Sequence, residues 1–134
     1  MPKEKKYHIP EGYELINQTE HHIRHIGDGY HKRDEDGNLI MAFWIKKENC
    51  NSADVAHGGM LMSIADYSLA SASMPSRDKY VATISFRSEF IAPAKIHSLA
   101  EVHTTVTTVS YTHLRAHETS LHLVCRLLLE KKNC

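Results

Sequence analysis

The apolar and polar positions of this chain change period several times, and each change marks an expected element. Over residues 60–73 the apolar residues recur at three- and four-residue steps, which is typical of a helix with a buried face. Pro75 is expected to end this helix. Residues 30–33 and 39–46 flank the turn-forming run Asp-Glu-Asp-Gly-Asn, and this arrangement predicts a β-hairpin.

Regular alternation predicts two further strands, at residues 80–91 and 98–108. Residues 11–26 are expected to hold a short helix, with Thr19 as its cap. The hairpin arm 39–46 is apolar on both faces, as a strand needs to be when it packs on a helix and on another neighbour. The order of elements therefore indicates an α+β fold in which an antiparallel sheet wraps round one long central helix.

Length and charge narrow the class of protein. A chain of 134 residues is sufficient for one domain with a single core. The formal net charge is zero and no basic stretch is present, so nucleic acid is not an expected partner. No apolar run is long enough to cross a membrane, and Cys50, Cys125 and Cys134 form no disulfide framework. These features favour a cytoplasmic protein.

The most informative stretch is the polar, Gly-rich run that leads into the central helix. Gly58 and Gly59 stand where the helix would begin, so its first N–H groups and the positive end of its dipole would be open to a ligand. Such a site can stabilise a carbonyl oxygen that becomes negative during a reaction. Asp66 lies about two turns further on, in a helix whose core-facing side normally avoids acids.

Three pieces of sequence together resemble one family. They are N-x-x-x-x-x-H-G-G over residues 51–59, an Asp seven residues after the second Gly, and F-I-A-P-A over residues 90–94. In this order and spacing, residues 11–108 resemble the hot-dog-fold acyl-CoA thioesterases of the phenylacetic-acid-degradation (PaaI-like) type. The resemblance implies a hot-dog fold, a homodimer or homotetramer, and active sites at the interface between two protomers.

The resemblance also assigns roles by position. It makes Asp66 the catalytic carboxylate, Gly58 the backbone donor to the thioester oxygen, and Asn51 a residue that places water or the carbonyl. His57 shapes the same turn, and Thr83 supplies a hydroxyl beside the carboxylate. In relatives the Asp and the hydroxyl come from one protomer and the Asn-His-Gly turn from the other. Each residue also has a structural interpretation: Asn51 as a turn former, His57 as a cap, and Thr83 as an ordinary strand residue.

The substrate side is less well defined by the sequence. Gly59 is expected to serve either close helix packing or the substrate. Arg87 and Lys95 are candidates for the CoA phosphates. Four apolar residues are expected to line the acyl pocket, namely Tyr67, Met62, Met74 and Phe86.

The predicted function is hydrolysis of an acyl-CoA or aryl-acyl-CoA thioester, without metal or organic cofactor. The alternative is a hot-dog module that binds acyl-CoA without turning it over; a hydratase is disfavoured because the paired Asp and His that it needs on one loop are absent. His21 and His25 are four residues apart, but no acidic or Cys partner stands at ligand spacing, so a solvated helix face is expected instead of a metal site. No local feature would lower the pKa of Cys50, which is expected to be a half-buried side chain.

The C-terminal segment differs in character from the rest of the chain. From Val109 to Lys132 it resembles the translation, in one frame, of a transposase-type sequencing adapter. This resemblance predicts a thioesterase domain over residues 1–108 that is incomplete at its C-terminal end, and a non-native tail over 109–134. The alternative is a native amphipathic tail helix. For a non-native tail, we expect its apolar residues to cover the open edge of the sheet as a helix, in a poorly soluble or inactive chain.

Overall fold

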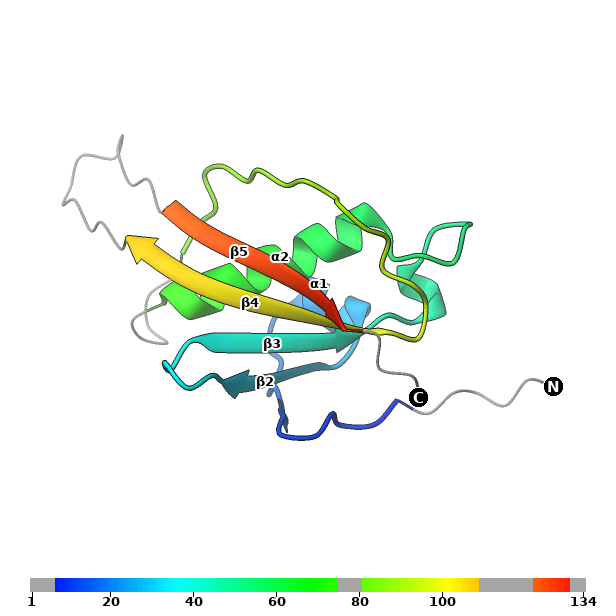
Figure 1. Cartoon of the computed structure of the whole chain (residues 1–134), viewed down its shortest axis with the longest axis horizontal. Helices are drawn as coiled ribbons and strands as arrows, with labels where there is room; N and C mark the ends of the chain where they lie inside the picture. Colours follow the sequence, from blue (N-terminus) through cyan, green and yellow to red (C-terminus); the bar gives the residue numbers. More distant parts are fainter. Residues whose placement is uncertain (1–6, 75–80, 109–121, 131–134) are drawn as a thin grey trace.

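The computed structural model describes residues 7–106 except 75–80, together with the backbone of 107–108 and 122–130. It is a curved antiparallel sheet with helices packed on one face (Figure 1). Neither α-helix in the described ranges has the length and apolar character that crossing a membrane requires. The elements in chain order are β1 (Glu14–Leu15), α1 (His21–Ile26), β2 (Gly29–Arg33), β3 (Leu39–Trp44), the 3-10 turn η1 (Lys47–Asn49), α2 (Gly58–Ser73), β4 (Leu99–Thr108) and β5 (His122–Glu130).

The sheet has five strands in the order β1-β2-β3-β4-β5, and every neighbouring pair is antiparallel. The predicted hairpin is confirmed as β2 and β3. Its turn is closed by two backbone hydrogen bonds, from Asp34 N to Asn38 O and from Gly37 N to Asp34 O, each 3.0 Å. Gly37 has a φ of 81°, a conformation that glycine adopts without a steric penalty.

The long helix α2 agrees with its prediction and begins two residues earlier, at Gly58. Its buried side includes two serines, whose hydroxyls donate to carbonyls one turn back: Ser68 to Ile64 at 2.7 Å and Ser73 to Leu69 at 2.9 Å. These bonds satisfy hydroxyls that would otherwise be costly to bury. The helix ends one residue before Met74, which precedes a proline and is held in extended backbone.

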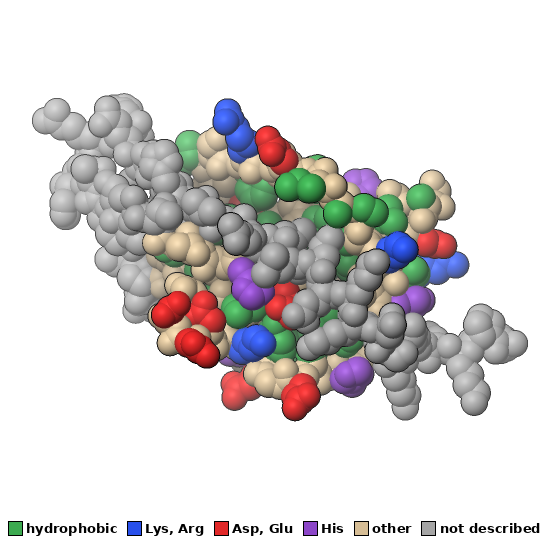
Figure 2. Space-filling view, in the orientation of Figure 1, with side chains coloured by type: hydrophobic (Ala, Val, Ile, Leu, Met, Phe, Trp, Pro, Cys, Tyr) green, Lys and Arg blue, Asp and Glu red, His purple; other side chains and the backbone are tan. Residues whose placement is uncertain are grey.

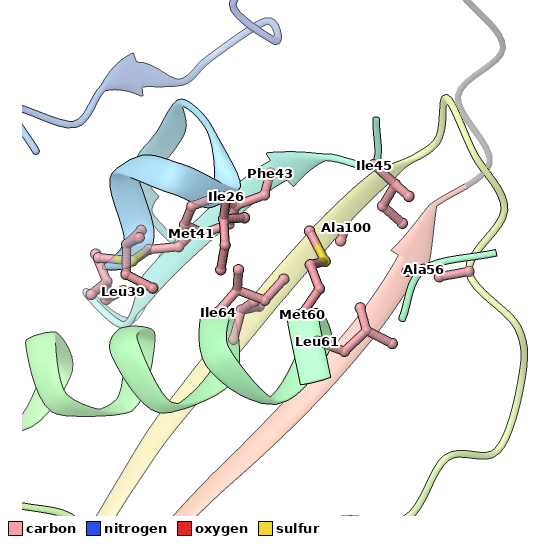
Figure 3. Close-up of a cluster of buried hydrophobic side chains, with 13 residues drawn as sticks. Ile26, Leu39, Met41, Phe43, Ile45, Ala56, Met60, Leu61, Ile64 and Ala100 are labelled. Carbon is pink, nitrogen blue, oxygen red and sulfur yellow. The ribbon is translucent and has the colours of Figure 1, made fainter. Parts of the chain in front are cut away.

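The main core lies between α2 and the sheet (Figure 3). Every second residue of β3 points into it, because successive side chains of a strand alternate between faces. α1 closes one side of this core with Ile23 and Ile26. The buried members from the sheet and α2 are Leu39, Met41, Phe43, Ile45, Ala100, Val102, Met60, Leu61 and Ile64.

A second cluster covers the opposite face of the sheet. It contains the other residues of β3 (Ile40, Ala42 and Trp44), so all six residues of this strand are buried. The N-terminal segment lies over this face: Trp44 Nε1 donates to the carbonyl of His8 at 2.8 Å, and the Tyr7 ring packs against the cluster. This arrangement confirms that the strand is apolar on both faces because both faces are covered.

The helix expected over residues 11–26 is shorter than predicted. α1 occupies only His21–Ile26, and the preceding stretch contains the two-residue strand β1. Thr19 is not the cap; the N-cap residue is Glu20, and its side chain makes no capping bond. The chain here follows the sheet edge, as the bond from Ile16 N to Gly29 O at 2.9 Å shows, and this pairing overrides the helical pattern.

The prediction of a strand over residues 80–91 is wrong for residues 81–91, the part that the structure describes. Residues 81–91 have no regular secondary structure and belong to no strand. Three of their large apolar side chains are exposed: Ile84 is 73%, Phe90 is 57% and Ile91 is 92% accessible. Figure 2 shows hydrophobic side chains along the upper edge of the molecule, where Figure 1 places this segment. Alternation alone does not make a strand, because the ladder also needs a neighbouring chain for its N–H and C=O groups.

The helix expected in the tail is also wrong. Residues 122–130 form β5, which pairs antiparallel with β4 along its length, with Val102 opposite Leu127. β4 therefore has a neighbour on both sides. The physical reason is that a short apolar run fits either a helix or a strand, and an open sheet edge offers hydrogen-bonding partners that a surface helix cannot use. The adapter-like origin of 109–134 and the domain boundary near residue 108 stay predictions.

Candidate active site

The loop before α2 is fixed by hydrogen bonds within the chain. Asn49 is buried, and its side-chain Nδ2 donates to the backbone carbonyl of Ile26 at 3.0 Å. The backbone carbonyl of Asn49 accepts from His57 N at 2.8 Å. The loop also pairs with residues 94–96: Ala56 N donates to Ala94 O at 2.7 Å. The position of the helix N-terminus is thus set by contacts on both sides.

Asn51 forms part of a tight turn in this loop. Its side-chain Oδ1 accepts from Ala53 N at 2.9 Å, and its backbone N donates to Val55 O at 2.9 Å. The side chain is exposed. The turn-forming interpretation of Asn51 is therefore present in the geometry, and its amide nitrogen makes no hydrogen bond within the described residues.

His57 is the N-cap of α2. Its Nδ1 accepts from Gly59 N at 2.9 Å, which satisfies one of the unpaired N–H groups of the first turn. This bond requires Nδ1 to be unprotonated, so the neutral ring carries its proton on Nε2. A Cβ on Gly59 would lie 3.0 Å from Nδ1. A side chain at residue 59 would therefore crowd the capping ring.

The N–H of Gly58 has no acceptor among the described residues. It is the first N–H of the helix, where the dipole is positive. A pocket of about 290 Å³ opens beside Gly58, between the start of α2 and the segment 90–94. Its lining residues are Ala56, Gly58, Leu61, Phe90, Ile91, Ala92, Pro93 and Ala94.

Asp66 and Thr83 are brought together as the sequence resemblance implied. The Thr83 hydroxyl donates to Oδ1 of Asp66. The Asp66 side chain is half-buried on α2, and no other hydrogen bond to it is found within the described residues. A carboxylate held by one hydroxyl keeps its second oxygen available for a water molecule or a substrate.

Gly58 and Asp66 are not adjacent within one chain. They are eight residues apart on the same helix, which corresponds to about 12 Å along its axis. A reacting carbonyl cannot lie within about 3 Å of both groups. One chain therefore carries the two halves of the candidate site at separate places.

The predicted pocket residues lie elsewhere. Tyr67 packs against the main core, and Met62 is 38% exposed on the surface of α2. Neither they nor Met74 and Phe86 line the pocket beside Gly58. Arg87 is exposed on the extended segment and has no ion pair within the described residues.

Sequence reasoning missed Phe90 and Leu61 as pocket residues. Phe90 was part of the recognised F-I-A-P-A motif, and this motif was the signal that could have identified it. Leu61 reads as an ordinary core position of the helix, and it is indeed 6% exposed. Only the packing of residues 90–94 against the helix start makes both of them line one cavity.

Reasoning from sequence also missed a link between the two helices. His22 of α1 lies with Nε2 3.2 Å from the Ser63 hydroxyl, which donates to Gly59 O at 2.8 Å. Because the serine proton points to a carbonyl, the histidine is not placed to remove it. The pair links α1 to the second turn of α2 and is not a nucleophilic dyad.

No group of three His, Cys, Asp or Glu side chains in the described part of the chain could hold a metal ion. His21 and His25 are exposed, as expected for a solvated helix face. Cys50 is partly buried, and its thiol donates to Lys46 O at 3.3 Å. Burial raises the pKa of this thiol, and the nearby carboxylates of Asp54 and Glu48 raise it further. Cys50 is therefore a poor nucleophile at neutral pH.

Comparison with known proteins agrees with this architecture. Residues 53–117 match the family model of the thioesterase superfamily. The match includes the start of α2, Asp66 and β4, and it continues past residue 108. A protein of Pseudomonas aeruginosa that is provisionally named an esterase is 30% identical over 100 residues, which cover 73% of this chain and 75% of the relative. The chain therefore belongs to the thioesterase superfamily, whose members share the hot-dog fold.

Proposed function

We propose that this protein hydrolyses an acyl-CoA or aryl-acyl-CoA thioester to the free acid and CoA, as a PaaI-like enzyme. The observation that carries the proposal is the half-buried carboxylate of Asp66, which stands on an otherwise uncharged helix and accepts a hydrogen bond from Thr83. Membership of the superfamily supports the thioester as the reacting bond. The unpaired Gly58 N–H supplies the complementary group at the helix start.

The chemistry needs few groups because a thiolate leaves readily. The thioester carbonyl oxygen accepts from Gly58 N–H, which stabilises the negative charge that develops on it. Asp66 takes a proton from a water molecule while the water oxygen bonds to the carbonyl carbon. The carbon–sulfur bond then breaks, and the proton held by Asp66 passes to the departing sulfur. No metal or organic cofactor takes part in this proposal.

The remaining site residues act on these two groups. His57 holds the first turn of α2 by capping it, and so fixes the direction of the Gly58 N–H. Asn51 presents its amide nitrogen from the preceding turn toward water or the carbonyl. Thr83 orients the carboxylate of Asp66. Exposed Arg87 is the candidate partner for a CoA phosphate, in a cytoplasmic enzyme.

The separation of Gly58 and Asp66 supports a homodimer or homotetramer. Since about 12 Å of helix lies between them, a complete site needs Gly58 from one protomer and Asp66 from another. Each interface between two protomers would then carry two sites related by symmetry.

A thiol-release assay over short, medium and aromatic acyl-CoAs tests the proposal. Asp66→Asn should lower kcat by about 10²-fold or more with unchanged secondary structure and oligomeric state. Asp28→Asn, at an exposed carboxylate before β2, is the matched control and should retain activity. Activity of the Asp66→Asn protein equal to that of the wild type would remove Asp66 from the mechanism.

The alternative is a module that binds acyl-CoA without turnover. Tight binding of several acyl-CoAs, measured by calorimetry, with no thiol release from any of them would favour it over the enzyme.

A further inference from the structure

The pocket beside Gly58 is apolar in its side chains. It is lined by one phenylalanine, one leucine, one isoleucine, one proline, three alanines and one glycine, and no lining side chain carries a charge or a hydrogen-bonding group. A pocket of about 290 Å³ is at the small end of ligand sites. For scale, an apolar cavity of about 150 Å³ accepts benzene.

Some backbone groups of the lining residues are not available to a ligand. Ala56 N donates to Ala94 O at 2.7 Å, and Pro93 has no N–H. Gly58 lines the pocket, and its N–H has no acceptor among the described residues. The pocket thus combines apolar side chains with this donor and with other backbone groups, such as those of Ile91 and Ala92, that have no partner within the described part of the chain.

Phe90 lies next to the position that a side chain on Gly58 would take. Its ring atoms lie 3.3, 3.6 and 3.8 Å from the place that a Cβ on Gly58 would occupy. The ring is 57% exposed, so it is not held in the main core. Phe90 therefore forms a wall of the pocket beside Gly58, and its size sets the space at the start of α2.

We propose that this pocket holds the acyl group of the substrate and that Phe90 determines how large that group can be. The proposal rests on the proposed function and adds a substrate class: neutral acyl groups with a short chain or a single ring. A carbonyl bound to Gly58 N–H places its substituent against Phe90 and Leu61, the apolar walls at the helix start. Dicarboxylic acyl groups are excluded, because the lining holds no cation to pair with a second carboxylate.

The test is a kcat/KM series over acetyl-, butyryl-, hexanoyl-, octanoyl-, benzoyl- and succinyl-CoA. Phe90→Ala should move the preference toward longer chains, and Phe90→Trp toward shorter ones, each by about 10-fold in the ratio of octanoyl- to butyryl-CoA. Succinyl-CoA should be the poorest substrate of the wild type. Leu15→Ala is the matched control, since Leu15 is 52% exposed and lies on β1, away from the pocket.

A second pair of variants tests the contact itself. Gly58→Ala keeps the N–H but brings a methyl group into tight contact with the Phe90 ring, so it should reduce kcat/KM for benzoyl-CoA by about 10-fold. Phe90→Leu in the Gly58→Ala background should restore most of that loss. Equal losses in the single and double variants would contradict the contact.

The two proposals fail in different ways. If the wild type releases thiol but its chain-length profile is unchanged in Phe90→Ala and Phe90→Trp, the pocket assignment is wrong while the enzyme assignment stands. If the wild type releases no thiol, the enzyme assignment fails. The Kd of each acyl-CoA in the same series, measured by calorimetry, then tests whether the pocket binds the acyl group. In that case a change of the preferred chain length in Phe90→Ala and Phe90→Trp supports the pocket assignment, and an unchanged preference overturns it.

Discussion

Two segments follow α2 in the chain, and they differ in how their positions are fixed. β4 has a hydrogen-bonded strand on each side, and its Leu99, Ala100 and Val102 are fully buried. The segment 81–91 has no strand partner within the described residues, and its Ile84, Phe90 and Ile91 side chains are exposed. Its described contacts with α2 are made at the candidate site, by Thr83 to Asp66 and by Phe90 beside Gly58.

This difference separates stability from function. Changes in β4 should act on the whole fold, since they disturb the sheet and the core together. Changes in 81–91 should act mainly on the site, since little buried surface depends on them. The exposed apolar residues of 81–91 also indicate that this segment is completed by another surface, which agrees with the proposed assembly of two protomers.

Removing residues 109–134 gives the largest expected effect. It takes away β5 and leaves the ten-residue strand β4 with an open edge. Open edges of this length favour aggregation, so we expect loss of soluble protein, measured by size-exclusion chromatography after expression. A soluble shortened chain that keeps its β-sheet circular dichroism would show that β5 is dispensable, and would agree with the non-native origin predicted for this tail.

Two matched leucine and isoleucine truncations compare the segments directly. Leu99→Ala removes a side chain with 0% exposure and should lower the free energy of unfolding by about 2–5 kcal/mol. Ile84→Ala acts at a side chain with 73% exposure and should change it by less than about 0.5 kcal/mol. Urea denaturation at equal protein concentration measures both. Similar losses in the two variants would mean that 81–91 is as firmly packed as β4.

Two threonines allow the same comparison for single hydrogen bonds. The buried Thr104 hydroxyl donates to Leu39 O at 2.8 Å, so Thr104→Val should cost about 1 kcal/mol of stability with little effect on turnover. The exposed Thr83 hydroxyl donates to Asp66, so Thr83→Val should lower kcat by about tenfold while leaving the unfolding midpoint unchanged. A loss of stability in Thr83→Val, or a loss of turnover in Thr104→Val, would contradict the assignment of Thr83 to the site and of Thr104 to the fold.

The smallest expected effect is a pH-dependent one at the hairpin turn. Backbone and side-chain hydrogen bonds from Asn38, then the backbone of Asp36 and the charge of His103 on β4, lower the pKa of Asp34. A lowered pKa in the folded state means that the Asp34 carboxylate stabilises the fold above its ordinary pKa of about 4. That contribution is lost as the pH falls through the folded pKa. Asp34→Ala should therefore be less stable than the wild type near neutral pH, with the difference shrinking in acid, as measured by urea denaturation across pH.

The sequence was sufficient to predict the elements that depend on local patterns of residues. α2 follows from the spacing of its apolar residues, and the β2–β3 hairpin from its Asp-Gly-Asn turn chemistry. β4 and 81–91 alternate equally well, and only the presence of a neighbouring strand distinguishes them. The contact of Phe90 with Gly58 joins residues 32 apart in the chain, and no local pattern encodes such a contact.

The N-terminal cover of the outer sheet face has a spectroscopic consequence. Trp44 is the protein's one tryptophan, it is 5% exposed, and its indole N–H donates to the carbonyl of His8. The rings of Tyr7 and His8 lie 5.8 and 5.5 Å from the indole, centroid to centroid. Its fluorescence is therefore an intrinsic probe of whether the N-terminal segment is seated on the sheet. Release of that segment would admit water to the indole and shift its emission to longer wavelength, without any change at the helix N-terminus on the opposite side of the sheet.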